Sequence, residues 1–473
     1  MAEKDQLLSA LLNKIDGILN GTDEHVPKSP DHYISWCMPG IPFQPEDLQF
    51  AVKGMNGKNA KETETLSRHA YEFARVVNAI PSSNVIDRKA IYETNGKTLW
   101  DVYNQILQFS EVSSSELTEA QKEKIDKFRK FFVTKKTVVD FSTDNEKQVS
   151  EDGPMLKVYN EKKAAYEDAV LEYNTKRLAA LNAENKQAVQ DFTLNASIYK
   201  SRVKQAFQAW GTSGYREEVE KMNAYIKQVS EKDLTFLKEE LSERMRMSKL
   251  TDINTSGEFY PTTFHPGNFV NNKKGWTKFT FDHTSRDKYS KDSSATTAAS
   301  LDVNFGLWNA SAGGSSGSGS DFNTSILGKF SIEFSIAQVP ISRPWFSPEF
   351  LMNKGWRWKE GNGMDELSNG GNPPEGQLIA YPTTAVFIKD ITIKTSDVEK
   401  FSNTLSKSLS ARGSVGFGPI VIGANHDDAS NEKNVKFKSD KNSLSVEGMQ
   451  LIALKCFALP KLPNPSPAIK NWV

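Results

Sequence analysis

The sequence predicts an α+β protein: a helical N-terminal region with a long antiparallel coiled hairpin, followed by an all-β, sandwich-like C-terminal domain. Up to about residue 250, apolar residues recur at the three- and four-residue spacing of helices. Between Pro154 and Trp210 the chain has no glycine and no further proline, which favours long helices. Beyond residue 250, Thr, Ser, Asn, Gly and aromatic residues dominate, and the apolar period shortens to two, as in strands.

The N-terminal helical region is expected to span 1–150. It opens with an apolar stripe at helical spacing, which we interpret as a candidate assembly helix: Leu8, Leu11, Leu12, Ile15 and Leu19. A proline-rich connector at 25–45 is expected to be an ordered loop or extended arm, because proline cannot donate a backbone hydrogen bond. Further helices are expected at 62–80, 97–111 and 118–134, the last with Thr118 and Gln121 as a capping box.

The segment 151–250 is expected to form the long hairpin. A continuous helix over 154–210 is expected to turn at the glycines of 211–214 and to pack against a second helix over 215–249. Several shorter bundle helices, with breaks that the pattern does not mark, are the alternative.

The β-rich domain is expected to span 251–473. Its candidate strands lie near 276–282, 300–308, 323–338, 384–395, 404–418, 419–425, 434–438, 443–447 and 449–458. The proline-rich tail after residue 459 is expected to be extended chain on the surface.

An alternating pair of segments joined by a Gly/Ser tract, within 296–341, is the most distinctive pattern. One face is apolar, and we take it as a candidate membrane or packing face: Leu301, Val303, Phe305, Leu307, Ile326, Phe330, Ile332, Phe334 and Ile336. Such a face suits either a half-buried sheet or the lipid side of a membrane β-hairpin. A second segment, 404–424, repeats the alternation. We favour the packing interpretation.

Three tryptophans form a candidate aromatic platform for a sugar or lipid: Trp345, Trp356 and Trp358. An aromatic plug that closes a β core is the simpler interpretation of the same residues. The histidines show no metal-ligand spacing, and no nucleophile or phosphate-loop motif occurs. We therefore predict no catalytic residues, no metal and no cofactor.

Charge and cysteine content limit the partners. Lys plus Arg equals Asp plus Glu at 59 each, which argues against nucleic acid and leaves little repulsion between copies. Two cysteines, Cys37 and Cys456, do not make a disulfide framework. No secretory signal and no membrane-spanning run is recognised, so a cytoplasmic location, or release without a classical signal peptide, is expected.

Several blocks of the C-terminal part resemble one group of uncharacterised microbial proteins with a helical front and a β-rich back. The blocks are Val339–Phe346, with its Arg-Pro-Trp sequence, and Thr383–Thr395, Ser408–Ala424 and Gly448–Ile452. The resemblance implies that about the last 140 residues form one module. It implies no activity, and no catalytic residue follows from it.

The sequence thus predicts a non-enzymatic structural or binding protein that assembles with itself into a homo-oligomer. A membrane-active, pore-forming protein that uses 300–338 and 404–424 as amphipathic β-hairpins is the first alternative, with a lipid membrane as its partner. A carbohydrate-binding module, or an enzyme with a scattered site, is the second.

Overall fold

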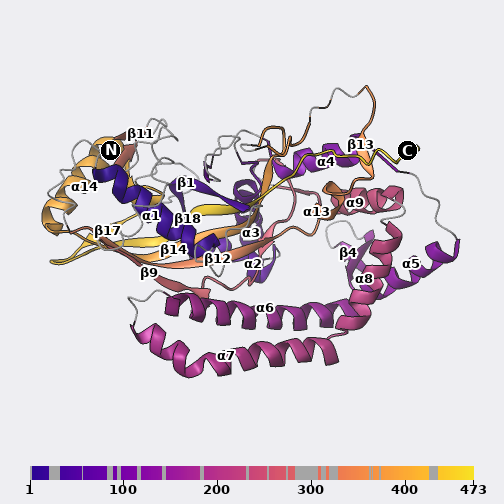
Figure 1. The fold of residues 1–473 in the computed structure, drawn as a ribbon, viewed down its shortest axis with the longest axis horizontal. Coiled ribbons are helices and arrows are strands. Elements are labelled where there is room, and N and C mark those ends of the chain that lie inside the picture. The colour runs from indigo at the N-terminus through magenta and orange to yellow at the C-terminus, as the bar shows by residue number, and fades with distance from the viewer. Residues whose placement is uncertain are drawn as a thin grey trace. The chain divides into compact units, whose positions relative to one another are not determined.

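The computed structural model describes residues 3–20, 32–55, 57–81, 89–92, 97–113, 119–140, 145–181, 186–230, 234–252, 255–272, 275–282, 307–310, 316–318, 329–361, 364, 366–371, 374–424 and 435–473. Within them the chain mixes helices and strands, as the sequence predicts, and an antiparallel sheet dominates the C-terminal part (Figure 1).

The helices begin and end as follows. They are α1 Glu3–Asn20, η1 Pro45–Leu48, α2 Phe50–Lys53, α3 Ala60–Val77, α4 Leu99–Phe109, α5 Glu119–Phe132, α6 Pro154–Leu181, α7 Lys186–Ser213, α8 Arg216–Ser230, α9 Leu234–Ser248, α13 Pro348–Leu351 and α14 Val398–Arg412. The expected helices at the N-terminus and near 62–80, 97–111 and 118–134 are therefore present. Thr118 of the expected capping box lies outside the described residues.

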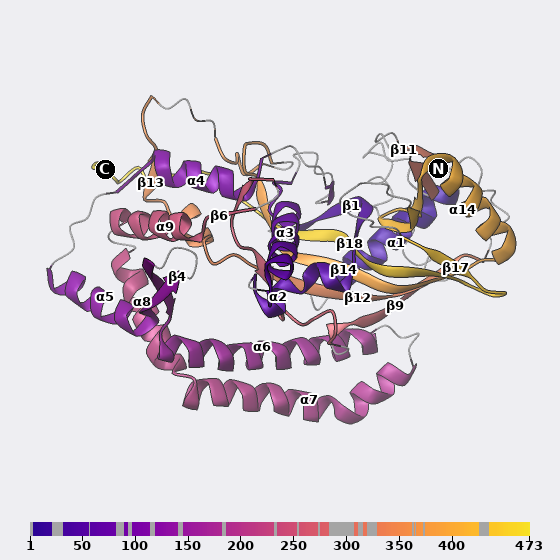
Figure 2. The same cartoon turned by 180° about the vertical axis from the view of Figure 1, so that it is seen from behind.

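The main sheet has eight strands in the order β2-β1-β18-β14-β12-β8, with β17 on β18 and β9 on β12. Its strands are β1 His32–Phe43, β2 Lys89–Ile91, β8 Thr263–Phe264, β9 Thr277–Phe281, β12 Ser331–Ser342, β14 Ala380–Lys394, β17 Phe437–Ser439 and β18 Leu444–Ala458. All pairs in it are antiparallel except β1 with β2. Figure 2 shows β18, β14 and β12 side by side in the sheet.

A second sheet of four strands has the order β11-β10-β15-β16. Its strands are β10 Leu307–Ala310, β11 Ser316–Ser318, β15 Ser414–Phe417 and β16 Ile420–Ala424. Two-stranded pairs complete the described strands: β3 Ser110–Val112 with β13 Trp356–Trp358, β4 Val133–Asp140 with β5 Asn145–Asp152, and β6 Leu250–Thr251 with β7 Glu258–Phe259.

One apolar core joins the main sheet, β15 and β16, and the helices α1 and α14. Phe334, Ile388 and Ile452 come from the main sheet, and Phe417 comes from the second sheet. Leu11 of α1 is in the same core. Strand β1 thus belongs to a sheet that the sequence assigns to the C-terminal domain, and helix α1 packs in its core.

The connector at 25–45 is in part a strand, which corrects the expected loop or arm. Tyr33, Ile34, Trp36 and Cys37 of β1 are buried, and β1 pairs with β18 along most of its length. Of the described prolines in the connector, Pro39 falls where the pairing register shifts, between Trp36 and Ile41, and Pro42 and Pro45 lie at and beyond the end of the strand. Proline is tolerated there because such irregular positions need fewer ladder hydrogen bonds.

The segment 404–418 is not a strand, because most of it belongs to helix α14. The Asp397 side chain accepts a hydrogen bond from the Lys400 N–H at the N-terminus of α14. Gly413, with a left-handed φ of 79°, ends the helix and donates to Leu409. Leu405 and Leu409 satisfy a period of two and also the four-residue spacing of a helix, so the pattern could not separate the two.

The predicted hairpin of 154–210 against 215–249 is not confirmed. Instead α6 and α7 pack against each other, with residues 182–185 between them outside the described residues. Tyr159 contacts Trp210 and Tyr173 contacts Phe192, so the two helices run antiparallel. The segment 215–249 forms two helices, α8 and α9.

The chain forms two compact units, each built from separate stretches of sequence. Unit 1 comprises 1–108, 244–352 and 361–463, and unit 2 comprises 109–243, 353–360 and 464–473. The boundaries of these units differ from those of the three segments expected from the sequence, because each unit takes residues from all three. None of the helices in the described ranges combines the length and the apolarity that a bilayer-spanning segment needs.

Candidate interaction surface

Some residues of the candidate membrane or packing face are buried in the core, and others lie outside the described residues. Phe330, Ile332, Phe334 and Ile336 are buried in the unit 1 core, and Phe334 stacks on Phe279 of β9 with 4.5 Å between ring centroids. Leu307 is on strand β10. The rest lie outside the described residues: Leu301, Val303, Phe305 and Ile326. In this fold Phe330, Ile332, Phe334 and Ile336 pack against their own chain.

The three tryptophans of the candidate platform do not offer three exposed rings. Trp345 belongs to unit 1, whereas Trp356 and Trp358 belong to unit 2. Trp345 is fully buried beside Trp100 and Tyr260, and its indole N–H donates to the Pro261 carbonyl. Trp356 is also fully buried. A sugar or lipid platform needs exposed rings, and these two rings are inaccessible.

The candidate assembly helix α1 also packs inward. All five residues of its stripe are at most 5% exposed: Leu8, Leu11, Leu12, Ile15 and Leu19. Lysines fix the helix to the sheet, because Lys14 donates to the Thr280 carbonyl at 2.6 Å and Lys455 donates to the Leu19 carbonyl. A lysine at the last carbonyls of a helix is also favoured by the helix dipole. The stripe is therefore not a free surface.

A buried polar network that the sequence did not predict lies in unit 1. The Arg343 guanidinium donates to the Asn78 side-chain oxygen at 2.6 Å and to the Val77 carbonyl at 2.8 Å. The Asn78 amide donates in turn to Ala74 and Thr262. Burial lowers the pKa of Arg343 to about 9, so the guanidinium still carries its charge at neutral pH. Its two acceptors belong to the C-terminal end of α3, where a cation is favoured.

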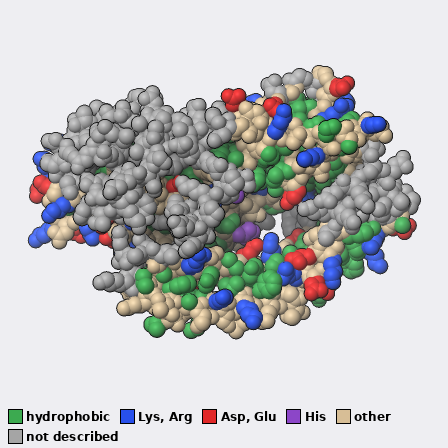
Figure 3. Space-filling model, viewed as in Figure 1, with side chains coloured by type: hydrophobic (Ala, Val, Ile, Leu, Met, Phe, Trp, Pro, Cys, Tyr) green, Lys and Arg blue, Asp and Glu red, His purple; other side chains and the backbone are tan. Residues whose placement is uncertain are grey.

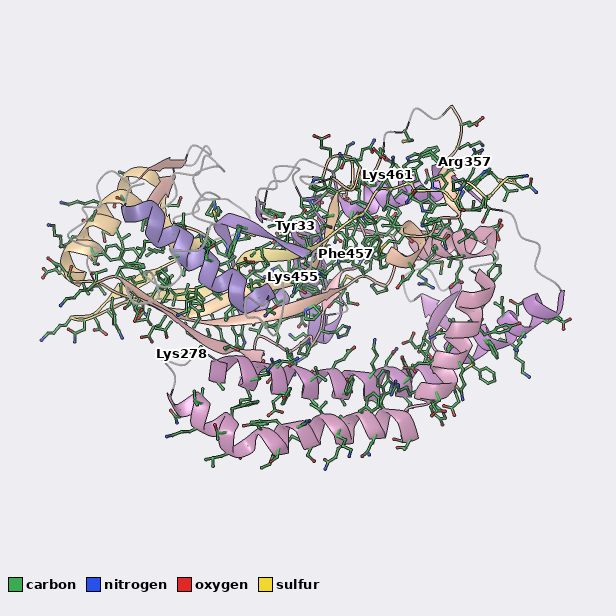
Figure 4. All side chains as sticks on the ribbon, in the orientation of Figure 1. Tyr33, Lys278, Arg357, Lys455, Phe457 and Lys461 are labelled. Atoms are coloured by element: carbon green, nitrogen blue, oxygen red, sulfur yellow. The ribbon has the colours of Figure 1, made fainter. Side chains whose placement is uncertain are left out.

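The buried thiols and the Tyr33 phenol of strands β1 and β18 are held in their neutral forms. Cys37 and Cys456 are buried and free, and burial raises the pKa of both thiols. Burial also raises the pKa of Tyr33, which pairs with Cys456 across β1 and β18. Figure 4 shows Tyr33, Lys455 and Phe457 on these two strands of the main sheet. Thiols with raised pKa values are poor nucleophiles, so this region supports packing rather than chemistry.

A small-molecule site is not evident in the described part of the chain. No group of three or more His, Cys, Asp or Glu side chains in those residues could hold a metal ion. A shallow hollow over α14 is lined by residues of that helix alone: Ser406, Lys407, Ser410 and Ala411. Ligand sites usually collect polar groups from several elements, so this hollow is a weak candidate.

Exposed apolar side chains concentrate in unit 2. Of the twelve large apolar side chains that are exposed among the described residues, nine belong to this unit: Phe109, Phe131, Val133, Val189, Leu194, Ile198, Phe207, Tyr215 and Val473. Unit 2 is the smaller unit, so the concentration does not follow from size. Exposed apolar residues that gather in one region mark interaction surfaces more often than scattered ones do.

Helix α7 carries the most exposed pair. Leu194 is 76% exposed and Ile198 is 50% exposed, one helical turn apart. The opposite side of α7 packs on α6 through Phe192 and Trp210, so Leu194 and Ile198 point away from that contact. We call the exposed residues around this pair the α7 face: Gln187, Gln190, Leu194, Ser197, Ile198, Ser201, Lys204, Gln205 and Gln208. Figure 3 shows apolar side chains along the α6–α7 pair, among lysines and arginines.

Two ion pairs connect α6 and α7 near the α7 face. Lys176 of α6 forms an ion pair of 2.7 Å with Asp191 of α7, and Arg202 of α7 pairs with Glu172 of α6 at 3.1 Å. Hydrogen bonding to Lys176 lowers the pKa of Asp191. The two pairs lie on either side of Leu194 and Ile198 along the helix. The sequence did not predict this surface. It predicts one continuous helix over 154–210, in which α6 and α7 do not pack against each other, so the side of α7 that stays exposed could not be identified.

Comparison with known proteins adds no relative. No protein-family model, no curated protein sequence and no solved structure matches the chain.

Proposed function

We propose that the protein is a non-enzymatic structural protein that assembles with a second copy of itself through the α7 face. The observation that carries the proposal is the exposure of Leu194 and Ile198, one turn apart, on a helix whose other side is already packed. Burying one such side chain is worth about 1.5–3 kcal/mol. The helices thus supply the contact between copies, as the sequence led us to expect.

The pattern of α7 suits an antiparallel, two-fold contact between copies. A two-fold axis near residue 196 brings Leu194 of each copy against Ile198 of the other, because the two residues are equally far from it. Gln187 and Gln205 are likewise equidistant and can exchange side-chain hydrogen bonds at the rim. Asp191 and Arg202 lie on one flank of the helix, five and six residues from the axis. Asp191 of each copy therefore lies near Arg202 of the other, which gives two contacts between opposite charges.

The charge of the chain favours a second copy as the occupant. Net charge is zero, so long-range repulsion between copies is weak. The exposed residues of α7 include no carboxylate, and its one acid, Asp191, already forms an ion pair with Lys176. In a symmetric contact, Asp191 also lies near Arg202 of the other copy. The charged residues of α7 are then matched by a second copy, so a partner of a different kind is not needed.

The pore-forming alternative is less well supported. The first part of the second segment, 404–412, is helical in α14, and a strand over 404–418 would place Lys407 on the same side as Leu405 and Leu409. A lysine near the middle of a lipid-facing strand costs about 2–4 kcal/mol. Phe330, Ile332, Phe334 and Ile336 of the first segment already serve as core. Liposome leakage remains the direct test of this alternative, and dye release by the purified protein would favour it.

Sedimentation velocity over a range of protein concentrations tests the assembly proposal. The wild-type protein is expected to associate reversibly at micromolar concentration, and Leu194→Asp and Ile198→Asp are each expected to be monomeric. Val52→Asp is the matched control, because Val52 is 63% exposed on α2 in unit 1, away from the α7 face in the sequence and in its own unit. A monomeric wild type, or unchanged association in both α7 variants, would contradict the proposal.

Cysteine crosslinking tests the two-fold geometry. Ser197 is exposed and next to the expected axis, and both native cysteines are buried. Ser197→Cys is therefore expected to form disulfide-linked dimers under mild oxidation. Ser213→Cys, at the far end of α7, is the control and is expected to stay reduced. Equal crosslinking of the two variants would exclude the antiparallel contact.

A further inference from the structure

We propose that unit 2 binds the surface of an anionic phospholipid membrane through a basic and apolar patch at the C-terminal end of helix α5. The patch, which we call the α5 patch, consists of four exposed residues: Lys127, Lys130, Phe131 and Val133. Helix α5 belongs to unit 2 and lies beside α6, α8 and β4 (Figure 1). The α5 patch shares no residue with the α7 face and takes a different partner.

Positive charge is concentrated in the chain from residue 127 to residue 136. These ten residues include no acid and five basic residues: Lys127, Arg129, Lys130, Lys135 and Lys136. Three phenylalanines and a valine stand among them. The chain as a whole has no net charge, so this is a local concentration. Basic residues interleaved with aromatic ones are typical of segments that lie on anionic membrane surfaces.

Helix α5 buries one side and exposes the other. Ile125 is fully buried and packs against side chains of α8 and α9. Lys127, two residues later, is on the opposite side of the helix. Lys127 precedes Lys130 by three residues and Phe131 by four, so these three side chains are neighbours on the exposed side.

The charges of the two lysines in the α5 patch are not neutralised within the described residues. Neither Lys127 nor Lys130 forms an ion pair with a described residue, whereas Arg129 pairs with Asp126 at 3.8 Å. An anionic surface therefore gains the full attraction of both ammonium groups, without first breaking a contact inside the protein.

Phe131 and Val133 supply an apolar contact beside the lysines. Phe131 is 43% exposed and Val133 is 45% exposed. Aromatic rings are favoured at the boundary between lipid headgroups and acyl chains, where lysines beside them can meet the lipid phosphates. The α5 patch thus matches an anionic membrane in both charge and polarity.

A membrane fits this patch better than a second copy or a nucleic acid does. In a two-fold contact between copies, the lysines of one patch would face those of the other, and like charges repel. A nucleic acid would attract the lysines through its phosphates, but the exposed apolar side chains would gain little from a phosphate backbone.

Co-sedimentation of the full-length protein with lipid vesicles tests the proposal. The protein is expected to bind vesicles made of phosphatidylserine and phosphatidylcholine in equal parts, and to bind vesicles of phosphatidylcholine alone far more weakly. Added salt is expected to weaken binding to the anionic vesicles. Equal binding to both kinds of vesicle, or no binding to the anionic ones, would overturn the proposal. Tighter binding to double-stranded DNA than to the anionic vesicles would assign the patch to nucleic acid instead.

Charge variants test whether the binding site is on α5. Lys127→Gln and Lys130→Gln are each expected to weaken binding to the anionic vesicles about fivefold. Glu123→Gln is expected to strengthen it, because Glu123 is exposed one turn before Lys127. Lys200→Gln is the matched control: Lys200 is exposed on α7 of the same unit, and this variant is expected to bind as the wild type does. Both α5 lysine variants binding as tightly as the control would contradict the site.

Two variants of Phe131 test the apolar contact. Phe131→Ala is expected to weaken vesicle binding at least about tenfold. Phe131→Trp is expected to retain it, because tryptophan is also favoured at the membrane interface. Equal loss in both variants, or no loss in Phe131→Ala, would exclude lipid contact by this ring. Sedimentation velocity of Lys127→Gln separates membrane binding from self-assembly, because association through the α7 face is expected to be unchanged.

Discussion

The guanidinium of Arg343 donates to the side-chain oxygen of Asn78 at 2.6 Å, and this contact joins the end of strand β12 to the end of helix α3. Asn78 is fully buried, and its amide also donates to Ala74 and to Thr262. Neighbouring Trp345 donates to Pro261, so the 260–262 segment is held from two sides. One asparagine thus links three parts of unit 1 that are far apart in the sequence.

Replacing Asn78 by Ala is expected to destabilise unit 1 by about 3–5 kcal/mol, because it leaves the Arg343 charge without one of its two acceptors. Urea denaturation monitored by tryptophan fluorescence measures the loss. Asn104→Ala is a suitable control, since the Asn104 side-chain oxygen accepts an exposed hydrogen bond from Gln108. A loss below about 1 kcal/mol, typical of surface positions, would contradict the role given to Asn78.

Gln450 connects the main sheet to the second sheet. Its amide donates to the Val421 carbonyl at 2.7 Å, and its side-chain oxygen accepts from the Val421 N–H at 2.9 Å. Gln450→Leu leaves both backbone groups of Val421 buried without partners, so a loss of about 2–4 kcal/mol is expected. Hydrogen exchange should then be faster in β15 and β16 than in β14. Uniform exchange rates in the variant and the wild type would show that the two sheets are held together by other contacts.

The serines of α14 distinguish a helix from the strand that the sequence suggested. Ser406 and Ser410 are exposed, and each hydroxyl donates to the carbonyl four residues before it. Alanine has the higher helix propensity, so Ser406→Ala and Ser410→Ala are each expected to raise stability by about 0.3–0.5 kcal/mol. In a strand the same changes would lower stability, because alanine is disfavoured there. Thermal unfolding of the double variant gives the sign.

The stability of the main sheet should fall in acid partly through Glu333. Hydrogen bonding to Lys278 and the charge of Lys394 lower the pKa of Glu333, and the two ion pairs measure 3.0 and 3.3 Å. A lowered pKa means that the stabilisation is present above the unfolded-state pKa of about 4.3 and is lost as pH falls through the folded-state value. Since the lysines are exposed, the effect should stay below about 1 kcal/mol.

Comparison of the wild type with Glu333→Gln over pH 7 to 3 measures that effect. The free energies of unfolding are expected to differ at neutral pH and to converge in acid, and added salt should reduce the difference at pH 7. A difference that persists at pH 3 would mean that the variant acts through packing instead of charge.

Leu11 tests whether α1 is core or assembly surface. Leu11 is fully buried in the core of unit 1, so Leu11→Ala is expected to cost about 2–5 kcal/mol. Its association state at low denaturant should match the wild type, because the residue is not exposed to a second copy. If Leu11→Ala loses association without losing stability, α1 is an assembly helix, as the sequence suggested.

Secondary structure was predictable where one periodicity dominated. The helices α3, α4 and α5 and the strands β9, β12 and β14 lie close to their expected positions. The pattern failed where two periods fit, as with Leu405 and Leu409 in α14, and where prolines hid a strand, as in β1. The hairpin of β4 and β5 had no prediction, because its sequence is mostly polar and charged. The α7 face was missed because it depends on which side of the helix α6 covers.

By itself, the sequence determined the helix-and-strand composition, the apolar faces of α1 and β12, and the lack of recognisable catalytic motifs, because these depend on local spacing and residue type. The tertiary structure alone decided which apolar faces are covered. Burial is set by contacts between distant segments, such as Lys455 with the end of α1. Such contacts do not produce a periodic pattern in the sequence. That is why the stripe expected to assemble is core, whereas Leu194 and Ile198 are exposed.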